Sequence, residues 1–342
     1  MKRYVSLAVV LAVIAMVVLA AGCKKDDDDD TPTELTPREK AIKDYTDNYV
    51  GSMVADPAWT GSTSGCNEGT ISQDARNKVI QRLNYFRRIC GLKDNVVENP
   101  DQHVGCQKAS LCFKAQNSLS HFPPQSWACW TQAGYDAAGT SNIAWGTATS
   151  GDFCVHSTYG VSGFIEDAGA NNTKVGHRAW FLMPGLFKLG VGSTNSTCCM
   201  QWKDNYNTTG TAGEFIAYPP SGFVPNAVVY PRWSFTIPTG AGFTGATVTM
   251  TDANGAPVTC NVINKPAHQP GSYPLQHLVW EPNINPATIM ADAKYTVTIN
   301  NVTGAPKTSY TYEVTIIPVT PSFKKVSPED TDNRVFMSVF GR

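Results

Sequence analysis

Charged side chains are scarce in this sequence: Asp, Glu, Lys and Arg make up 16% of the 342 residues, and the formal net charge is −1. A surface that binds nucleic acid needs a concentration of Lys and Arg, so the composition predicts no nucleic-acid partner. Glycine and proline are plentiful instead, with 28 and 22 residues. That balance is typical of a secreted protein rich in loops and strands, and the length allows two domains.

The sequence also lacks the short motifs of two common site chemistries. No Cys-x-x-Cys pair occurs, and the cysteine spacing does not fit a zinc knuckle. No Gly-x-Ser-x-Gly motif is present, so the neighbours Ser120 and His121 have no oxyanion-hole signature beside them. Local motifs therefore indicate neither a zinc knuckle nor a serine hydrolase.

The N-terminus is built like a targeting segment. Basic Lys2 and Arg3 precede an apolar run, which ends in Leu-Ala-Ala-Gly-Cys at Cys23. Residues 1–22 thus resemble a bacterial lipoprotein signal peptide, which implies lipidation of Cys23 and a membrane partner held through that lipid. The alternative is a transmembrane anchor, because the apolar run is about long enough to span a bilayer.

Residues 23–35 contain five successive aspartates, which repel one another and predict a solvated acidic tether. A short acidic run after a lipidated cysteine resembles the surface-export signal of Bacteroidetes lipoproteins. The expected location is the outer membrane, lipid-anchored and exposed at the cell surface, with the periplasmic side as the alternative. Either location is oxidising, and this bears on the cysteines.

Eight cysteines lie between Cys66 and Cys199, and they predict disulfides, up to four in one domain. Cys198 and Cys199 are adjacent, and a bond between them would need a strained ring, so we expect them to have separate partners. Cys260 stands apart and is expected to be a buried free thiol.

Apolar residues at helical spacing predict helices through most of the first half of the chain. A capping box at Thr36 predicts a helix in the segment 36–66, and Gly91 is expected to end a second helix. Residues 122–160 are rich in Gly, Trp and Thr and are expected to form loops and short segments. Further helices are predicted at 73–90, 100–121 and 157–169, and strands at 178–183 and 188–194.

Beyond about Phe223 the pattern changes to alternation of period two, typical of strands. Asn254 and Gly255 separate two alternating runs and predict a hairpin. We therefore expect residues 223–320 to form an all-β sandwich of immunoglobulin-like type. Residues 321–342 are expected to be a C-terminal tail.

An ordered series of motifs covers roughly residues 70–200: "VIQRLNYFRRICGL", "CQKASLCFKAQNSLSH", "AAGTSNIAWG", "FIEDAGANNTKVGHRAWFLMP" and "KLGVG". The series resembles the CAP superfamily, which comprises cysteine-rich secretory, antigen 5 and pathogenesis-related 1 proteins. The resemblance implies an α-β-α sandwich at 67–222. With the β-sandwich that follows, the expected fold class is α+β.

CAP domains gather two histidines and two acidic residues in a cleft, and the matching histidines here are His121 and His177. Imidazoles from separate elements can share a proton or a divalent ion, zinc or another, and neighbouring carboxylates orient them. The distance between the two rings in a structure tests this pair; about 7 Å or less would allow one shared ion.

The acidic half of the site is less complete. The usual Glu-Asn of the family is Ser141-Asn142 here, so one carboxylate is missing. The other acidic position falls on Asp167, with Glu166 beside it; the alternative for both is a solvated helix end. A tightly held metal wants three or four convergent ligands, so the gap weakens the case for zinc and for a hydrolase.

The remaining polar and aromatic candidates have structural alternatives. Arg178 could bind a carboxylate or a phosphate, or form a structural salt bridge. The other four histidines are expected at the surface, and four tryptophans either line an apolar groove or pack in the core. These residues are His103, His156, His268 and His277, and Trp127, Trp130, Trp145 and Trp180.

Three functions are compatible with these patterns. The favoured one is a surface protein whose cleft binds a lipid, a sterol-like molecule or a peptide, without catalysis. The alternative is a metal-assisted peptidase or esterase that uses His121, His177 and Asp167. The third is a structural envelope protein with a vestigial cleft.

Overall fold

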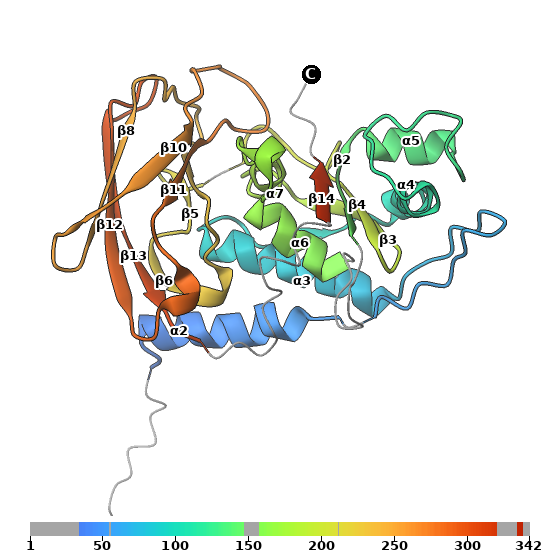
Figure 1. Cartoon of the computed structure of the whole chain (residues 1–342), viewed down its shortest axis with the longest axis horizontal. Helices are drawn as coiled ribbons and strands as arrows, with labels where there is room; N and C mark the ends of the chain where they lie inside the picture. Colours follow the sequence, from blue (N-terminus) through green and yellow to red (C-terminus); the bar gives the residue numbers. More distant parts are fainter. Residues whose placement is uncertain (1–33, 55, 147–156, 211, 320–333, 338–342) are drawn as a thin grey trace, which may run out of the picture. The chain divides into compact units, whose positions relative to one another are not determined.

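The computed structural model describes residues 34–54, 56–146, 157–210, 212–319 and 334–337. The predicted signal peptide, Cys23, the aspartate run, His156 and most of the predicted C-terminal tail lie outside the described residues. Figure 1 shows helices and three sheets, which confirms the α+β class. Residues from Pro37 onward form one unit, and this unit is described below.

Helices concentrate in the first half of this unit. Ser72 accepts a hydrogen bond from Ala75 N and caps α3, and Gly91, at φ +69°, follows its end as predicted. The helical elements are α2 (Pro37–Asp44), η1 (Tyr45–Tyr49), η2 (Val50–Ser52), α3 (Gln73–Ile89), η3 (Pro100–Gln102), α4 (His103–Gln116), α5 (Gln132–Ala138), α6 (Ser157–Glu166), η4 (Ala170–Asn172), α7 (Gly176–Phe181), η5 (Asn226–Val228) and η6 (Pro286–Thr288).

The first sheet has the strand order β1-β3-β4-β2-β14. Its strands are β1 (Val97–Glu98), β2 (Ser141–Gly146), β3 (Lys188–Ser193), β4 (Thr197–Gln201) and β14 (Arg334–Met337). Cys199 packs with α4 and α5 on one face, whereas Cys198 packs with α3 and α6 on the other. Adjacent side chains of a strand point to opposite faces, so these two cysteines belong to different layers.

Two further sheets form the second half, one with the order β10-β11-β7-β5 and one with the order β6-β13-β12-β8-β9. Their strands are β5 (Ile216–Tyr218), β6 (Gly222–Pro225), β7 (Trp233–Thr236), β8 (Thr247–Asp252), β9 (Pro257–Val258), β10 (Cys260–Asn264), β11 (Leu278–Pro282), β12 (Ala293–Asn300) and β13 (Ser309–Ile317). The sheets face each other: Trp280 donates to the sulfur of Met250, and Phe235 stacks with Tyr312.

The predicted hairpin is confirmed, because β8 pairs with β9 across Asn254 and Gly255. The predicted alternation is confirmed as well: β12 pairs with β13 along the whole of β12, and Tyr310 and Tyr312 are buried. β5 lies before residue 223 in the chain but pairs with β7 of the second half.

Several local predictions were wrong. Residues 178–183 were predicted as a strand, but most of them belong to helix α7, where Arg178 N donates to the Asp167 carboxylate. The Asp167 carboxylate thus accepts a hydrogen bond from a backbone N–H of the first helical turn. Asp167 lies outside the apolar run 178–183 from which the strand was predicted. The helix predicted at 100–121 already ends at Gln116, because Asn117 adopts a left-handed conformation at φ +54°. The loops and short segments expected at 122–160 include α5 and β2.

The described cysteines form fewer disulfides than predicted. One disulfide is present, Cys66–Cys129. The other described cysteines are thiols, namely Cys90, Cys106, Cys112, Cys198, Cys199 and the half-buried Cys260. Most of them occupy the core as small apolar groups, which satisfies their burial without a bond.

Candidate functional site

Asp167 and His177 meet in the interior, whereas the resemblance implied that they line a cleft. Asp167 follows α6 at φ +56°, and its Oδ1 lies 2.6 Å from Nδ1 of His177 on α7. Neither side chain is exposed. The His177 ring stacks on Phe164, with centroids 5.0 Å apart. The local geometry is that of an imidazole oriented by a carboxylate.

Arg178, the next residue, is also fully buried, and burial lowers the pKa of its guanidinium. It donates to the carbonyl oxygens of Ile165 and Glu166, and to Oγ of Ser234 on β7 at 2.9 Å. Hydrogen bonds on its nitrogens compensate the loss of water. Arg178 therefore ties the α6–α7 turn to the second half of the unit.

Two of the remaining predicted site residues, Ser141 and Asn142, begin β2. His121 Nδ1 is 2.7 Å from Ala138 O, at the end of α5. Ser141 Oγ donates to Ala137 O, and Asn142 Nδ2 donates to His177 O at 3.1 Å. The end of α5 therefore contacts His121, and the start of β2 contacts the His177 backbone. Glu166 is half-buried.

These residues do not assemble the ligands of a held divalent ion. Among the described residues, no group of three or more His, Cys, Asp or Glu side chains is placed to bind a metal. Ser141 and Asn142 are fully buried and supply no carboxylate, and Nδ1 of His177 is engaged by Asp167. The described residues thus carry no observation in favour of the metal-assisted hydrolase.

Two surface predictions for the other histidines were wrong. His277, which precedes β11, is 2% exposed, and burial together with the nearby Arg178 lowers its pKa to about 3. His103 is half-buried, with one ring nitrogen 2.7 Å from Val191 O and the other 2.9 Å from Oγ1 of Thr70. Both rings fill space between elements, which a local sequence window does not reveal. His268 is exposed, as predicted.

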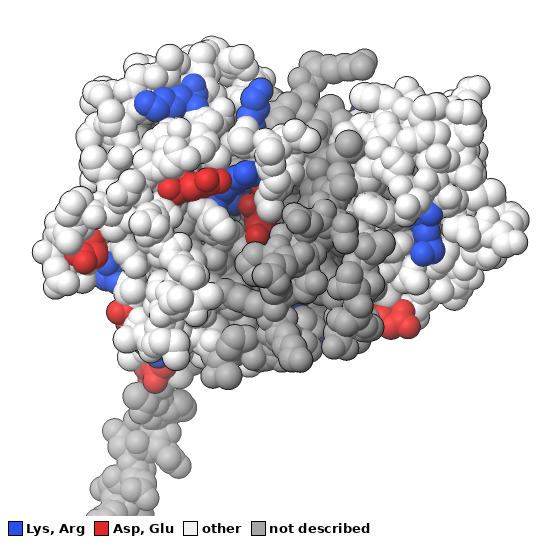
Figure 2. Space-filling view, in the orientation of Figure 1, with Lys and Arg blue, Asp and Glu red and all other residues white. Residues whose placement is uncertain are grey.

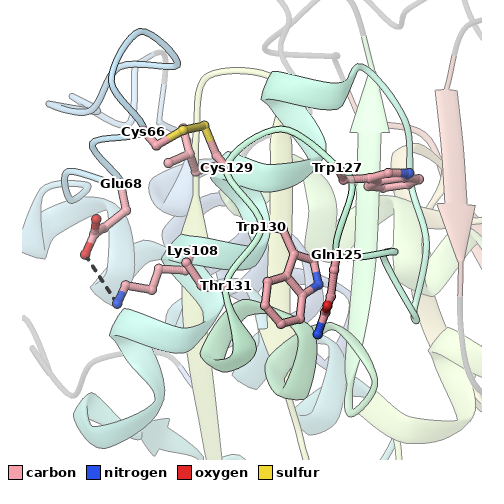
Figure 3. A pocket seen from close by; sticks show the side chains of 9 residues that line it. Cys66, Glu68, Lys108, Gln125, Trp127, Cys129, Trp130 and Thr131 are labelled. Atoms are coloured by element: carbon pink, nitrogen blue, oxygen red, sulfur yellow. Dashed lines mark ion pairs between the residues drawn. A yellow bond between two sulfur atoms is a disulfide. The ribbon is translucent and has the colours of Figure 1, made fainter.

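A pocket of about 330 Å³ is lined in part by Lys108 and Leu111 of α4 (Figure 3). Trp127 and Trp130 line it, together with the polar side chains of Glu68, Lys108 and Gln125. We call this set the tryptophan pocket. Of the two roles considered for the tryptophans, Trp127 and Trp130 line a pocket that is partly polar rather than an apolar groove. Trp127 also packs against a core cluster, and Trp180 stacks on Trp202 in the core with centroids 3.4 Å apart.

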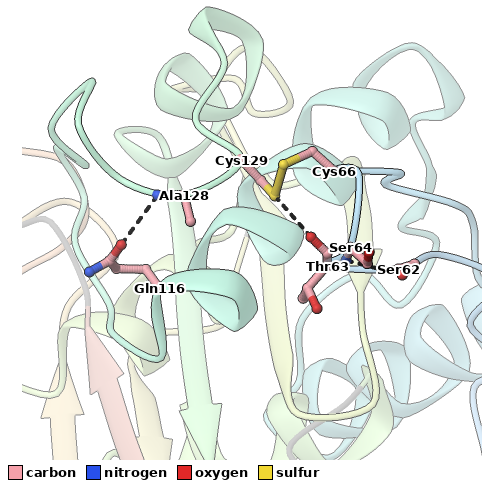
Figure 4. Close-up of a disulfide and its surroundings, with 7 residues drawn as sticks. All are labelled: Ser62, Thr63, Ser64, Cys66, Gln116, Ala128 and Cys129. Atoms are coloured by element: carbon pink, nitrogen blue, oxygen red, sulfur yellow. Dashed lines mark hydrogen bonds between the residues drawn. A yellow bond between two sulfur atoms is a disulfide. The ribbon is translucent and has the colours of Figure 1, made fainter.

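The walls of the tryptophan pocket are fixed by local contacts. Trp130 Nε1 donates to Pro123 O at 2.9 Å, which sets the plane of its ring. The disulfide Cys66–Cys129 joins the loop before α3 to the loop before α5 (Figure 4). Ala128 N donates to Oε1 of Gln116 at the end of α4, so the loop that carries both tryptophans is held at both sides.

Sequence reasoning missed the polar half of this pocket. Glu68, Lys108 and Gln125 come from three separate segments, and only the disulfide and the packing of α4 bring them together. The signal that could have found it is the dense stretch "SWACWT", in which two tryptophans flank a cysteine.

Neither the protein-family models, nor the curated proteins, nor the solved structures contain a match to this chain. The site is therefore interpreted from its own chemistry. Among the described residues, no helix is long and apolar enough to cross a membrane. Figure 2 shows one face of the molecule, on which charged side chains of both signs are few and interspersed.

Proposed function

We propose that this protein is a lipid-anchored protein of the cell envelope that binds a ligand in the tryptophan pocket. The observation that carries the proposal is the pocket itself. Its volume of about 330 Å³ is within the range of small-molecule sites, and aromatic rings and convergent polar groups line it. The walls are held by a disulfide and by backbone hydrogen bonds, so little ordering opposes binding.

The resemblance to CAP domains enters this proposal as an expectation about ancestry and ligand. It favours a lipid, a sterol-like molecule or a peptide in the cleft near His121 and His177. The full burial of His177 and Asp167 leads us to place the ligand in the tryptophan pocket instead. In this proposal the histidine region acts as a structural clamp.

The location is proposed from the N-terminus and supported by the disulfide. A bond such as Cys66–Cys129 persists in an oxidising compartment, which agrees with export across the inner membrane. Cys23 would carry the lipid, and the run of aspartates would direct the chain to the cell surface.

The binding proposal is tested with two glutamine variants. Gln125→Ala removes a polar side chain from the pocket, whereas Gln132→Ala removes a similarly exposed one from α5, outside the pocket. Purified protein is screened by ligand-observed NMR against small lipids, sterols, peptides and sugars. We expect at least one compound to bind, with weaker binding to Gln125→Ala only. Equal binding to both variants and the wild type would place the ligand elsewhere.

The location is tested by membrane fractionation and by protease treatment of intact cells. Cys23→Ala should move the protein out of the detergent-soluble membrane fraction. Replacing the five aspartates at 26–30 by asparagine, with Cys23 retained, should keep it anchored but protect it from external protease. If the asparagine variant stays as accessible as the wild type, the acidic run is not an export signal.

A further inference from the structure

The tryptophan pocket also has a charge pattern that restricts its ligand. Its charged side chains are Glu68 and Lys108, whose charged atoms lie 3.9 Å apart (Figure 3). The two charges oppose each other at close range, so the lining has no net charge to attract an ion. A carboxylate or ammonium ligand would have to break this pair, whereas a neutral polar ligand would hydrogen-bond to both members.

The lining is half polar and half apolar, which restricts the ligand further. Leu111 is its one aliphatic side chain, and the other apolar surface is mainly the flat rings of Trp127 and Trp130. An acyl chain or a sterol would leave the amide of Gln125 and the Glu68–Lys108 pair desolvated without partners, at a cost in binding free energy. The ligand therefore needs an apolar flat face and a polar edge.

The polar groups supply both donors and acceptors around the rings. Gln125 is exposed, and its amide makes no hydrogen bond to the described residues, so both its oxygen and its nitrogen face solvent or ligand. Thr131 Oγ1 accepts from Gly134 N at 3.1 Å and keeps its own proton to donate. Hydroxyl groups, which donate and accept, match such a mixture better than groups of one kind.

We infer that the ligand of the tryptophan pocket is a neutral sugar, either free or as the end of a glycan; this inference rests on the proposed function. A pyranose ring has an apolar face of C–H groups, which packs on an aromatic ring, and an edge of hydroxyls. The Trp130 ring is fixed in position before any ligand binds. Its Nε1–H donates to Pro123 O, and the ring contacts the Tyr135 ring with centroids 6.3 Å apart. A ring locked before binding costs little entropy.

The test uses the purified full chain in detergent and saturation-transfer NMR. The probes are neutral methyl glycosides of glucose, galactose, mannose and N-acetylglucosamine, with methyl glucuronide as the charged counterpart. We expect saturation of the C–H face of at least one neutral glycoside and weaker binding of the glucuronide. Trp130→Ala should weaken binding about threefold to tenfold, the size of one aromatic stack, and Gln132→Ala should leave it unchanged.

Trp130→Phe retains a ring and guards against misfolding: intermediate affinity is expected, with the unfolding midpoint of the wild type. Phosphatidylcholine vesicles and a mixture of short neutral peptides separate the two proposals. If the peptides or the lipid bind in a manner that depends on Gln125 and the glycosides do not, the sugar inference is wrong and the pocket function stands. If no probe depends on Gln125 or Trp130, both are wrong.

Discussion

At the scale of single residues, the Asp167 carboxylate has two tasks. One oxygen holds His177, and the other accepts from Arg178 N at the start of α7. Asp167→Asn keeps the shape and tolerates the left-handed backbone, but it removes the negative charge beside two buried donors. We expect the free energy of unfolding to fall by about 1–3 kcal/mol, measured by urea denaturation.

The matched variant Asp167→Ala separates the hydrogen bonds from the backbone conformation. Alanine loses both bonds and also resists φ +56°, which adds about 1–2 kcal/mol of strain. Alanine should therefore be the more damaging of the two. Equal stability of all three proteins would show that the carboxylate does not hold the α6–α7 turn.

His277 makes stability depend on pH in a predictable direction. Its pKa is lowered from 6.5 to about 3 in the folded state, mainly by burial. Below pH 6.5 the unfolded chain therefore binds a proton that the folded chain does not. The contribution to stability is complete above about pH 6.5 and is lost as the pH falls toward 3.

The measurement is the free energy of unfolding at pH 7.5 and pH 5.0 for the wild type and for His277→Gln. The wild type should lose more stability between these two values, by an amount of the order of 1–2 kcal/mol. Carboxyl groups titrate alike in both proteins, so the difference isolates His277. Parallel profiles would mean that His277 is accessible to protons in the folded state.

At the scale of the elements, Asn117 ends α4, and the chain that follows it leads to the tryptophan pocket. Its φ of +54° places it where glycine is comfortable and alanine is strained. Asn117→Gly should unfold at about the wild-type temperature, and Asn117→Ala should lose about 1 kcal/mol, both measured by thermal unfolding. If alanine matches glycine, the left-handed turn is not what stops the helix.

The elements also show what a sequence pattern can predict. β12 and β13 pair with each other and alternate regularly, so a local reading placed them correctly. Helix α7 is a short apolar segment, and its type depends on Asp167, which lies outside that segment. The pocket depends on a disulfide between cysteines 63 residues apart, and spacing alone cannot choose that pairing. Patterns therefore predicted the periodic elements and missed what long-range contacts decide.

At the scale of the whole molecule, the two halves share one core. Buried residues of α3, α6 and β4 pack in the same cluster as residues of β5, β7 and β13. Arg178 reaches Ser234, and Arg232 donates to Asp167 O at 2.6 Å in the opposite direction. The packing is therefore continuous between the two halves.

The shared core predicts that the first half does not fold alone. A fragment of residues 37–210 would expose Arg178 and the apolar surface that β5 and β7 cover. It should show no cooperative thermal transition by circular dichroism, whereas the full chain should show a single one. A fragment that melts cooperatively at the temperature of the full chain would establish two independent domains.

The disulfide Cys66–Cys129 affects the stage at which the tryptophan pocket is completed. It forms part of the wall of the tryptophan pocket. If the chain is exported as we propose, it would lack this wall in the reducing cytoplasm and acquire it only after crossing the inner membrane. On the proposed function, the protein would pass through the cell with an unfinished pocket. It would become competent to bind in the compartment where its ligand is met.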